Sequence, residues 1–282
     1  MGHTAWERQP TLQSPVVITA FEGWNDAGDA ATMAIRHLRD TWGLEKCGAI
    51  EAEEFYDFTT NRPHVRRREG RGREIRWPRN WWYSGSVPEG PDVIVLLGTE
   101  PALRWRTFCA EVVNTAQQHS ATMVVSLGAL LADVPHHVPT PVVGAAYDDG
   151  VIDRLGLDHS NYEGPTGIVG VLHDACATAG IASASLWAAV PTYVPGAPSP
   201  KAALALIDRL ADLLELSIER DSLVVGALAY EQQISELVDD DEELAEYVNE
   251  LIAEHEDRGP GTMPSGNELI ADIERFLRDR GA

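Results

Sequence analysis

Short apolar runs rich in β-branched residues alternate with helix-forming segments from residue 16 to residue 200. Residues 16–21 are a short, β-branched apolar run and residues 93–97 are continuously apolar, as strands buried on both faces of a sheet are. The other predicted strands are residues 47–55, 122–127, 142–146 and 183–190. Strands that alternate with helices in this way form a mostly parallel sheet covered on both faces. The chain is therefore predicted to fold as a three-layer α/β/α sandwich.

The segments between these strands have helical spacing. After the first strand, Ala30, Ile35 and Leu38 fall on one face of a helix that Asn25 or Asp26 can cap. Further helices are predicted over residues 101–119 and 166–179. These helices supply the two outer layers of the sandwich.

The composition changes towards the C-terminus, where helical and strongly acidic segments follow one another. Residues 202–218 form an amphipathic helix, and residues 221–255 are helical with a break at three consecutive aspartates. Asp240 with Glu243 is typical of a capping box at that break, and Ser265 can cap a last helix. We therefore expect an α/β/α domain over residues 1–218 and an acidic helical C-terminal domain over residues 219–282.

The charge balance bears on partners and location. The chain has 44 acidic and 22 basic side chains, a formal net charge of -22. Such a surface repels phosphate backbones and anionic lipids. Nucleic acid is therefore an unlikely partner, and no membrane partner is expected. No run approaches the ~20 apolar residues of a membrane span, and no signal peptide is evident. We expect a cytoplasmic protein.

Metal and cofactor signatures are also missing from the sequence. The three cysteines, Cys47, Cys109 and Cys176, are too few and too scattered for a disulfide framework or a zinc site. No phosphate-binding loop or dinucleotide fingerprint is present. No cofactor and no metal are therefore expected.

Residues 62–79 are rich in arginine and so break the acidic trend of the chain. Trp77 lies among them, and Trp81 and Trp82 follow directly after. Arginine interleaved with aromatic residues can bind nucleic acid. We favour the interpretation that these arginines pair with the acidic helices, within the chain or on a neighbouring subunit. The arginines are Arg62, Arg66, Arg67, Arg68, Arg71, Arg73, Arg76 and Arg79.

Polar residues cluster where ligands of α/β proteins bind, beyond the carboxyl ends of the predicted strands. One group follows the first strand, another follows residues 93–97, and a third lies in the loop after residues 122–127. A Gly-Pro-Thr-Gly turn precedes the helix at residues 166–179. The candidate cleft comprises Asn25, Asp26, Glu100, His136, Gly164, Thr166 and Gly167.

Each of these groups has a structural interpretation beside the functional one. The turn at residues 164–167 can present N–H groups to an anion, but we favour a tight turn with Thr166 as helix N-cap. His136 and His137 with Asp133 are a weak metal motif, and a structural histidine is the favoured interpretation.

Acid–base chemistry is a further option, because Asp26, Glu100 and Asp133 have side chains of the right type. Their separation does not follow from the sequence. No nucleophile elbow is present, and no cysteine has a recognisable histidine partner. No catalytic residue is therefore assigned, and whether the protein is an enzyme stays open.

Seven short segments between residues 20 and 194 are recognisable together and in order. They are AFEGWNDAG at residues 20–28, EFYDF at 54–58, GTEP at 98–101, DVPH at 133–136, GPTGI at 164–168, SLWA at 185–188 and PTYV at 191–194. With the acidic helical tail, they resemble the bacterial, actinobacterial-type branch of the proteasome assembly chaperone family.

This resemblance implies a phosphorylase/hydrolase-like α/β/α sandwich with a small helical domain. It also implies a homo-oligomer, with a trimer as the candidate form, and a protein partner such as proteasome subunits. Some relatives engage the core proteasome through a hydrophobic-Tyr-any ending. This chain ends Asp279-Arg280-Gly281-Ala282, so docking through the tail is not expected.

The leading hypothesis is a non-catalytic interaction or assembly protein, because the resemblance is specific and no catalytic set is complete. The alternative is a protein that binds a nucleoside-like or anionic small molecule, or a hydrolase- or phosphorylase-like enzyme, acting at the cleft. A third hypothesis is nucleic-acid binding through residues 62–79.

Overall fold

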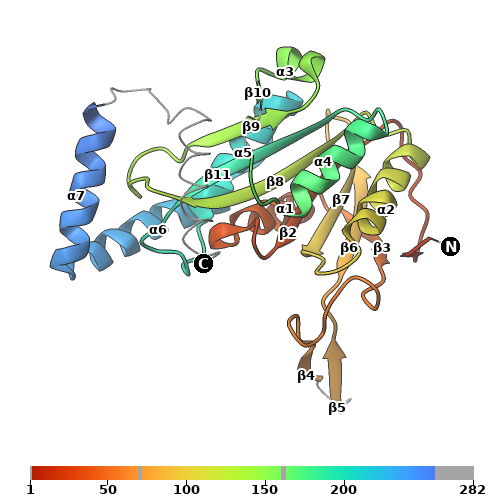
Figure 1. Ribbon diagram of the computed structural model, residues 1–282, viewed down its shortest axis with the longest axis horizontal. Helices are drawn as coiled ribbons and strands as arrows, with labels where there is room; N and C mark the ends of the chain where they lie inside the picture. Colours follow the sequence, from red (N-terminus) through yellow and green to blue (C-terminus); the bar gives the residue numbers. More distant parts are fainter. Residues whose placement is uncertain (1, 69–71, 160–162, 258–282) are drawn as a thin grey trace.

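A computed structural model describes residues 2–68, 72–159 and 163–257, and its centre is a nine-stranded sheet (Figure 1). In spatial order its strands are β1 (Thr4–Trp6), β3 (Glu45–Ile50), β6 (Asn80–Ser86), β7 (Asp92–Thr99), β2 (Val16–Glu22), β8 (Met123–Ala132), β11 (Ser183–Pro191), β9 (Val142–Ala146) and β10 (Asp158–His159).

The middle of this sheet is parallel and its flanks are mixed. Strands β7, β2, β8 and β11 run parallel to one another. The chain of pairs β1–β3–β6–β7 is antiparallel, and so is the pair of β11 and β9. β6 and β7 are joined by a short turn, which only an antiparallel pair allows. The predicted three-layer sandwich is confirmed, with its parallel strands in the middle of the sheet.

Helices cover both faces of the sheet. α1 (Ala30–Thr41) and α5 (Pro200–Leu214) pack on one face, and α2 (Trp105–Gln118) and α4 (Ile168–Thr178) on the other. Both faces of β2 are covered, because Ile18 faces the first helix pair and Val17 the second. This explains why the strand is mostly apolar on both sides. The shorter helices are η1 (Ala27–Asp29) and α3 (Asp149–Leu155).

Two further helices, α6 (Asp221–Asp239) and α7 (Glu242–Asp257), follow α5. Tyr230 and Ile234 of α6 pack with Val248 of α7 in a small apolar cluster. Asp241, not Asp240, caps α7, because its Oδ1 accepts hydrogen bonds from the N–H groups of residues 243 and 244, both at 3.1 Å. The helix expected after Ser265 lies outside the described residues, and the domain boundary at residue 218 stays a prediction.

The segment from residue 51 to residue 79 differs most from expectation. The strand predicted over residues 47–55 ends at Ile50, and Phe55 instead closes a turn through its N–H bond to the Ala52 carbonyl (3.0 Å). Beyond it, β4 (His64–Arg68) and β5 (Gly72–Arg76) form a separate two-stranded hairpin that projects from the body (Figure 1).

No helix in the described part of the chain is long and apolar enough to cross a membrane.

Candidate functional site

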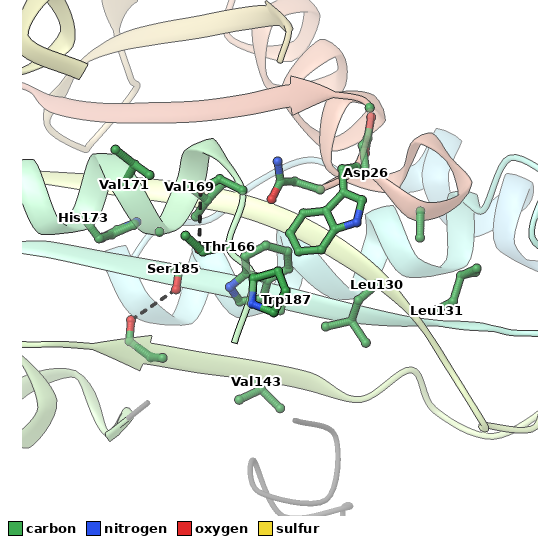
Figure 2. A pocket seen from close by; sticks show the side chains of 18 of the residues that line it. Asp26, Leu130, Leu131, Val143, Thr166, Val169, Val171, His173, Ser185 and Trp187 are labelled. Carbon is green, nitrogen blue, oxygen red and sulfur yellow. Dashed lines mark hydrogen bonds between the residues drawn. The ribbon is translucent and has the colours of Figure 1, made fainter. Parts of the chain in front are cut away.

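A cleft of about 900 Å³ lies on the sheet face that carries α4, towards the carboxyl ends of β2, β8 and β11. Figure 2 shows Leu130, Val143 and Trp187 along the sheet, with Thr166, Val169 and His173 contributed by α4 and the turn before it. The loop after β2 forms part of the wall, and is held against β8 by the Ala129 N–H, which donates to the Asn25 carbonyl (2.8 Å).

Trp187 forms part of the floor of the cleft because its neighbour across the sheet is a glycine. Trp187 of β11 stands opposite Gly128 of β8, and a Cβ atom at residue 128 would lie 2.5 Å from the indole ring. The ring therefore lies against the sheet. Glycine here is needed for close approach, not for an unusual backbone angle.

Asn25, Glu100 and Gly167 meet at the N-terminus of α4. The Glu100 Oε1 atom accepts hydrogen bonds from Asn25 Nδ2 (2.8 Å) and from the Ile168 N–H (2.9 Å). Gly167, not Thr166, is the N-cap residue, and it has no side chain to offer. Glu100 thus takes the position of a capping side chain from a distant strand, where negative charge also suits the helix dipole.

An anion is a poor ligand for this helix end, because a carboxylate of the chain already occupies it. Thr166 and Gly164 line the cleft nearby. The Asn25 Oδ1 atom is buried and has no hydrogen-bond partner within the described residues. It is a buried polar atom of this cluster whose bonding is incomplete.

Asp26 caps the other helix that begins at this edge. Its Oδ1 atom accepts from the N–H groups of Ala31 (2.7 Å) and Thr32 (3.1 Å), and its Oδ2 atom accepts from Thr32 Oγ1 (2.6 Å). Asp26 is 5% exposed, and burial raises its pKa to about 6 although these hydrogen bonds oppose the shift. Asp26, which lines the cleft, and Glu100 at the start of α4 are therefore both engaged in holding helices.

His136 lies outside the cleft. Its Nδ1 atom is 2.9 Å from the Tyr193 hydroxyl, and its Nε2 atom is 2.9 Å from Ser235 Oγ of α6. The Lys201 ammonium donates to its carbonyl (2.6 Å). His136 lies outside the cleft because β8 continues to Ala132 and carries the following loop to the C-terminal helices.

Asp133 of the same loop also lies outside the cleft and contacts a C-terminal helix. It accepts hydrogen bonds from Thr192 Oγ1 (2.8 Å) and from the Tyr247 hydroxyl of α7 (3.0 Å). Asp26, Glu100 and Asp133 therefore serve three separate networks. Across the ranges that the structure describes, no group of histidine, cysteine and acidic side chains is arranged to hold a metal ion.

His173 is a cleft residue that the sequence did not single out. It is buried on α4, burial lowers its pKa to about 4, and its Nε2 atom has no hydrogen-bond partner among the described residues. The signal available was its position one turn after Val169 on an otherwise apolar helix face. Such a histidine is neutral at pH 7 and can donate or accept a hydrogen bond.

Sequence and structure comparisons agree on the family. The PAC2 family model matches residues 20–238. A PAC2 family protein from Streptomyces avermitilis is 46% identical, with a TM-score of 0.78, and the match covers 83% of this chain and 99% of that one. A proteasome-assembly chaperone homologue from Mycobacterium tuberculosis is also 46% identical, with the same coverage and a TM-score of 0.76.

More distant structures share the fold alone. An archaeal proteasome activator from Pyrococcus furiosus is 17% identical, with a TM-score of 0.69, over 84% of this chain and 99% of its own. No curated protein sequence matches this chain. The family model spans most of the sheet and its covering helices, and on that basis the chain belongs to the PAC2 family.

Proposed function

We propose that the protein is a non-catalytic interaction or assembly factor of the proteasome-assembly-chaperone type, with proteasome subunits among its partners. The observation that carries this proposal is the 46% identity to the Mycobacterium tuberculosis proteasome-assembly chaperone homologue over 99% of that protein. Such a role places the protein in the cytoplasm. A homo-oligomer, with a trimer as the candidate form, is part of the proposal.

The engagement of Asp26 and Glu100 supports a non-catalytic role. Catalytic acids and bases need a free lone pair or proton directed at a substrate. Asp26 and Glu100 instead accept hydrogen bonds from the first residues of α1 and α4. The buried thiols are equally unsuited to nucleophilic chemistry, because burial raises the pKa of Cys109 and Cys176 to about 12.

The direct test is reconstitution. Separately purified proteasome α and β subunits from the source organism are mixed with and without the full chain, and native mass spectrometry follows half and full cores over time. We expect a complex of the chain with α subunits and faster formation of half cores. Serum albumin at equal concentration is the control. Unchanged assembly, with no complex at any time point, would rule out this role.

A second candidate function is binding of a small planar molecule in the cleft. A cavity of about 900 Å³, floored by Trp187 and bordered by two buried polar atoms that have no partner among the described residues, has the size and lining of a ligand site. The atoms are Asn25 Oδ1 and His173 Nε2. A neutral, nucleoside-like ligand is favoured over an anion, because Glu100 already holds the start of α4.

Thermal unfolding with added ligand tests this second candidate. A nucleoside at about a hundredfold excess over its Kd should raise Tm by roughly 5 °C or more. Adenosine, guanosine, uridine and inorganic phosphate are the probes. Trp187→Leu should abolish the shift, whereas Trp77→Leu, a change at an exposed tryptophan outside the cleft, should preserve it. No shift with any probe would leave the cleft without this function.

A further inference from the structure

The loop after β8 joins the C-terminal helices to the body of the protein through His136. In Figure 1 α6 extends away from the sheet, and α7 lies beyond its far end. The first half of α6 packs on α5. The second half reaches His136 through Ser235, and α7 reaches the same loop through the hydrogen bond from Tyr247 to Asp133. His136 is 5% exposed, so its ring makes these contacts out of water.

The hydrogen bonds of His136 determine which ring nitrogen carries the proton. The Tyr193 oxygen accepts a hydrogen bond from the His136 main-chain N–H (2.7 Å). Within the described residues the only acceptor for the hydroxyl proton of Tyr193 is the His136 Nδ1 atom, 2.9 Å away. Nδ1 is therefore unprotonated, and Nε2 carries the ring proton and donates it to Ser235 Oγ (2.9 Å). One neutral tautomer satisfies both partners of the ring.

A second proton on the ring disrupts this arrangement. Nδ1–H and the main-chain N–H then both point at the Tyr193 oxygen, and the hydroxyl proton loses its acceptor. The hydroxyl cannot lose that proton instead, because burial raises the pKa of Tyr193. The new charge also lies close to the Lys201 ammonium, which donates to the His136 carbonyl (2.6 Å). Burial, with His137 and Lys201 beside the ring, accordingly lowers the pKa of His136.

The acidic groups near His136 do not remove this cost. Glu231 and Asp239 of α6 favour the protonated ring, but Glu231 is already paired with Lys201. Asp239 is exposed at the end of the helix, where solvent screens its charge. Tyr230 of α6 lines the same narrow pocket as His136, and burial raises its pKa, so it stays neutral. The surroundings of the ring therefore suit a neutral imidazole.

We propose that the contact of His136 with Tyr193 and Ser235, here called the His136 contact, is a pH-sensitive switch. The neutral ring holds the second half of α6, and α7 with it, against the body, and protonation of the ring releases them. Release exposes the apolar cluster that Ile234 of α6 forms with Val194 of the body. The switch goes beyond the assembly role proposed above and does not depend on it.

The direction of the switch follows from the lowered pKa of His136. The folded state binds the proton less readily than the unfolded or released state, in which histidine has its ordinary value of 6.5. The stabilisation from the His136 contact is therefore complete above about pH 6.5 and is lost as the pH falls below it. Histidine is the side-chain type that changes charge in this range of pH.

Hydrogen exchange of the full-length chain tests the switch, with mass spectrometry as the readout and correction for the intrinsic exchange rate at each pH. Between about pH 7.5 and about pH 5, protection over residues 232–252 should fall at least about threefold relative to that of α2. His136→Gln cannot take up a proton, so its relative protection should agree at the two pH values within about 1.5-fold. The matched control is His64→Gln, at an exposed histidine of β4, which should keep the wild-type pH dependence.

The tautomer is measured independently of any effect on stability. Long-range proton–nitrogen NMR spectra of histidine-labelled wild type should show a ring protonated on Nε2 alone at about pH 7.5, with a titration midpoint below 6.5. The signal of His136 is identified by its absence from the spectrum of His136→Gln. Tyr193→Phe removes the donor to Nδ1, and should lower protection over residues 232–252 at least about threefold at about pH 7.5.

Three results would overturn the proposal. One is protection over residues 232–252 that changes with pH no more than that of α2. Another is a pH dependence that persists unchanged in His136→Gln. The third is a ring of His136 that is protonated on Nδ1 at about pH 7.5. None of these results bears on the proteasome reconstitution, so either proposal can fail alone.

Discussion

Replacing Asp26 with alanine is expected to lower the free energy of unfolding by about 3 kcal/mol at pH 5 and by about half as much at pH 8. The loss arises because Asp26 satisfies the N–H groups of Ala31 and Thr32 and the hydroxyl of Thr32. Alanine leaves these donors without a partner at a buried helix end. The dependence on pH arises from the pKa of Asp26.

The pKa of Asp26 is raised to about 6 in the folded protein from its ordinary value of 3.8, chiefly by burial and slightly by the charge of Asp29. The folded state therefore binds a proton more readily than the unfolded state. The stabilisation from this carboxyl is complete below pH 3.8 and is lost as the pH rises through about 6. Between pH 5 and pH 8 the free energy of unfolding of the wild type falls by about 1.4 kcal/mol relative to that of a variant that lacks the carboxyl.

Asparagine at residue 26 separates the contribution of the hydrogen-bond acceptor from that of the titrating charge. Asp26→Asn keeps an oxygen for the two N–H donors and should stay within about 1 kcal/mol of wild type at pH 8. The matched control is Asp29→Asn, at an exposed left-handed residue that asparagine tolerates, with an expected change below about 0.5 kcal/mol. Urea unfolding at both pH values is the measurement. Equal losses for alanine and asparagine at both would contradict this account.

The sequence predicts the middle of the sheet well and its basic flank badly. β2 and β7 are mostly apolar because both faces of each strand are covered. β6 was missed because its buried residues alternate with half-buried aromatic ones and directly follow arginine-rich chain. The hairpin of β4 and β5 gave no strand signal either, since each of its strands has one apolar residue among charged ones.

The place of some cleft residues could be predicted from the sequence and that of others could not. Asn25 and Glu100 are 75 residues apart, yet each follows a strand of one parallel pair, so the topology alone brings them together. His136 was expected beside them because the end of β8 is not marked in the sequence, where apolar residues continue past residue 127. The place of Trp187 depends on a glycine in the neighbouring strand, which no local pattern reveals.

Two of the recognised family segments are linked by hydrogen bonds at the carboxyl end of β7. The Tyr56 hydroxyl donates to the Thr99 carbonyl (2.6 Å), and Asn80 Nδ2 donates to the same carbonyl (3.0 Å). The Ala102 N–H donates to the Phe55 carbonyl (2.8 Å). Burial raises the pKa of Tyr56, which keeps its hydroxyl protonated as a donor. This network fixes the strand end that carries Glu100.

Gly98 is the residue on which this strand end depends, and Gly98→Ala should lower the free energy of unfolding by about 3 kcal/mol or more. Gly98 stands opposite Asn80 in the antiparallel pair of β6 and β7. A Cβ atom there would lie 2.2 Å from the Arg79 carbonyl oxygen and 2.6 Å from the Asn80 Cα atom. Both contacts are with backbone, so no side-chain rotation can relieve them.

Two comparisons isolate this backbone contact. Gly85→Ala changes a glycine in the same strand pair whose Cβ would meet a leucine methyl group at 2.9 Å, and it should cost about 1 kcal/mol because that group can move. Adding Asn80→Ala to Gly98→Ala should not restore stability, because the strand backbone still blocks the methyl group. Guanidinium unfolding gives the three values. Two outcomes would contradict this account: a Gly98→Ala protein as stable as Gly85→Ala, or one whose stability is restored by Asn80→Ala. Either would show that the backbones of β6 and β7 can move apart, and that Glu100 can cap α4 without a rigid strand end.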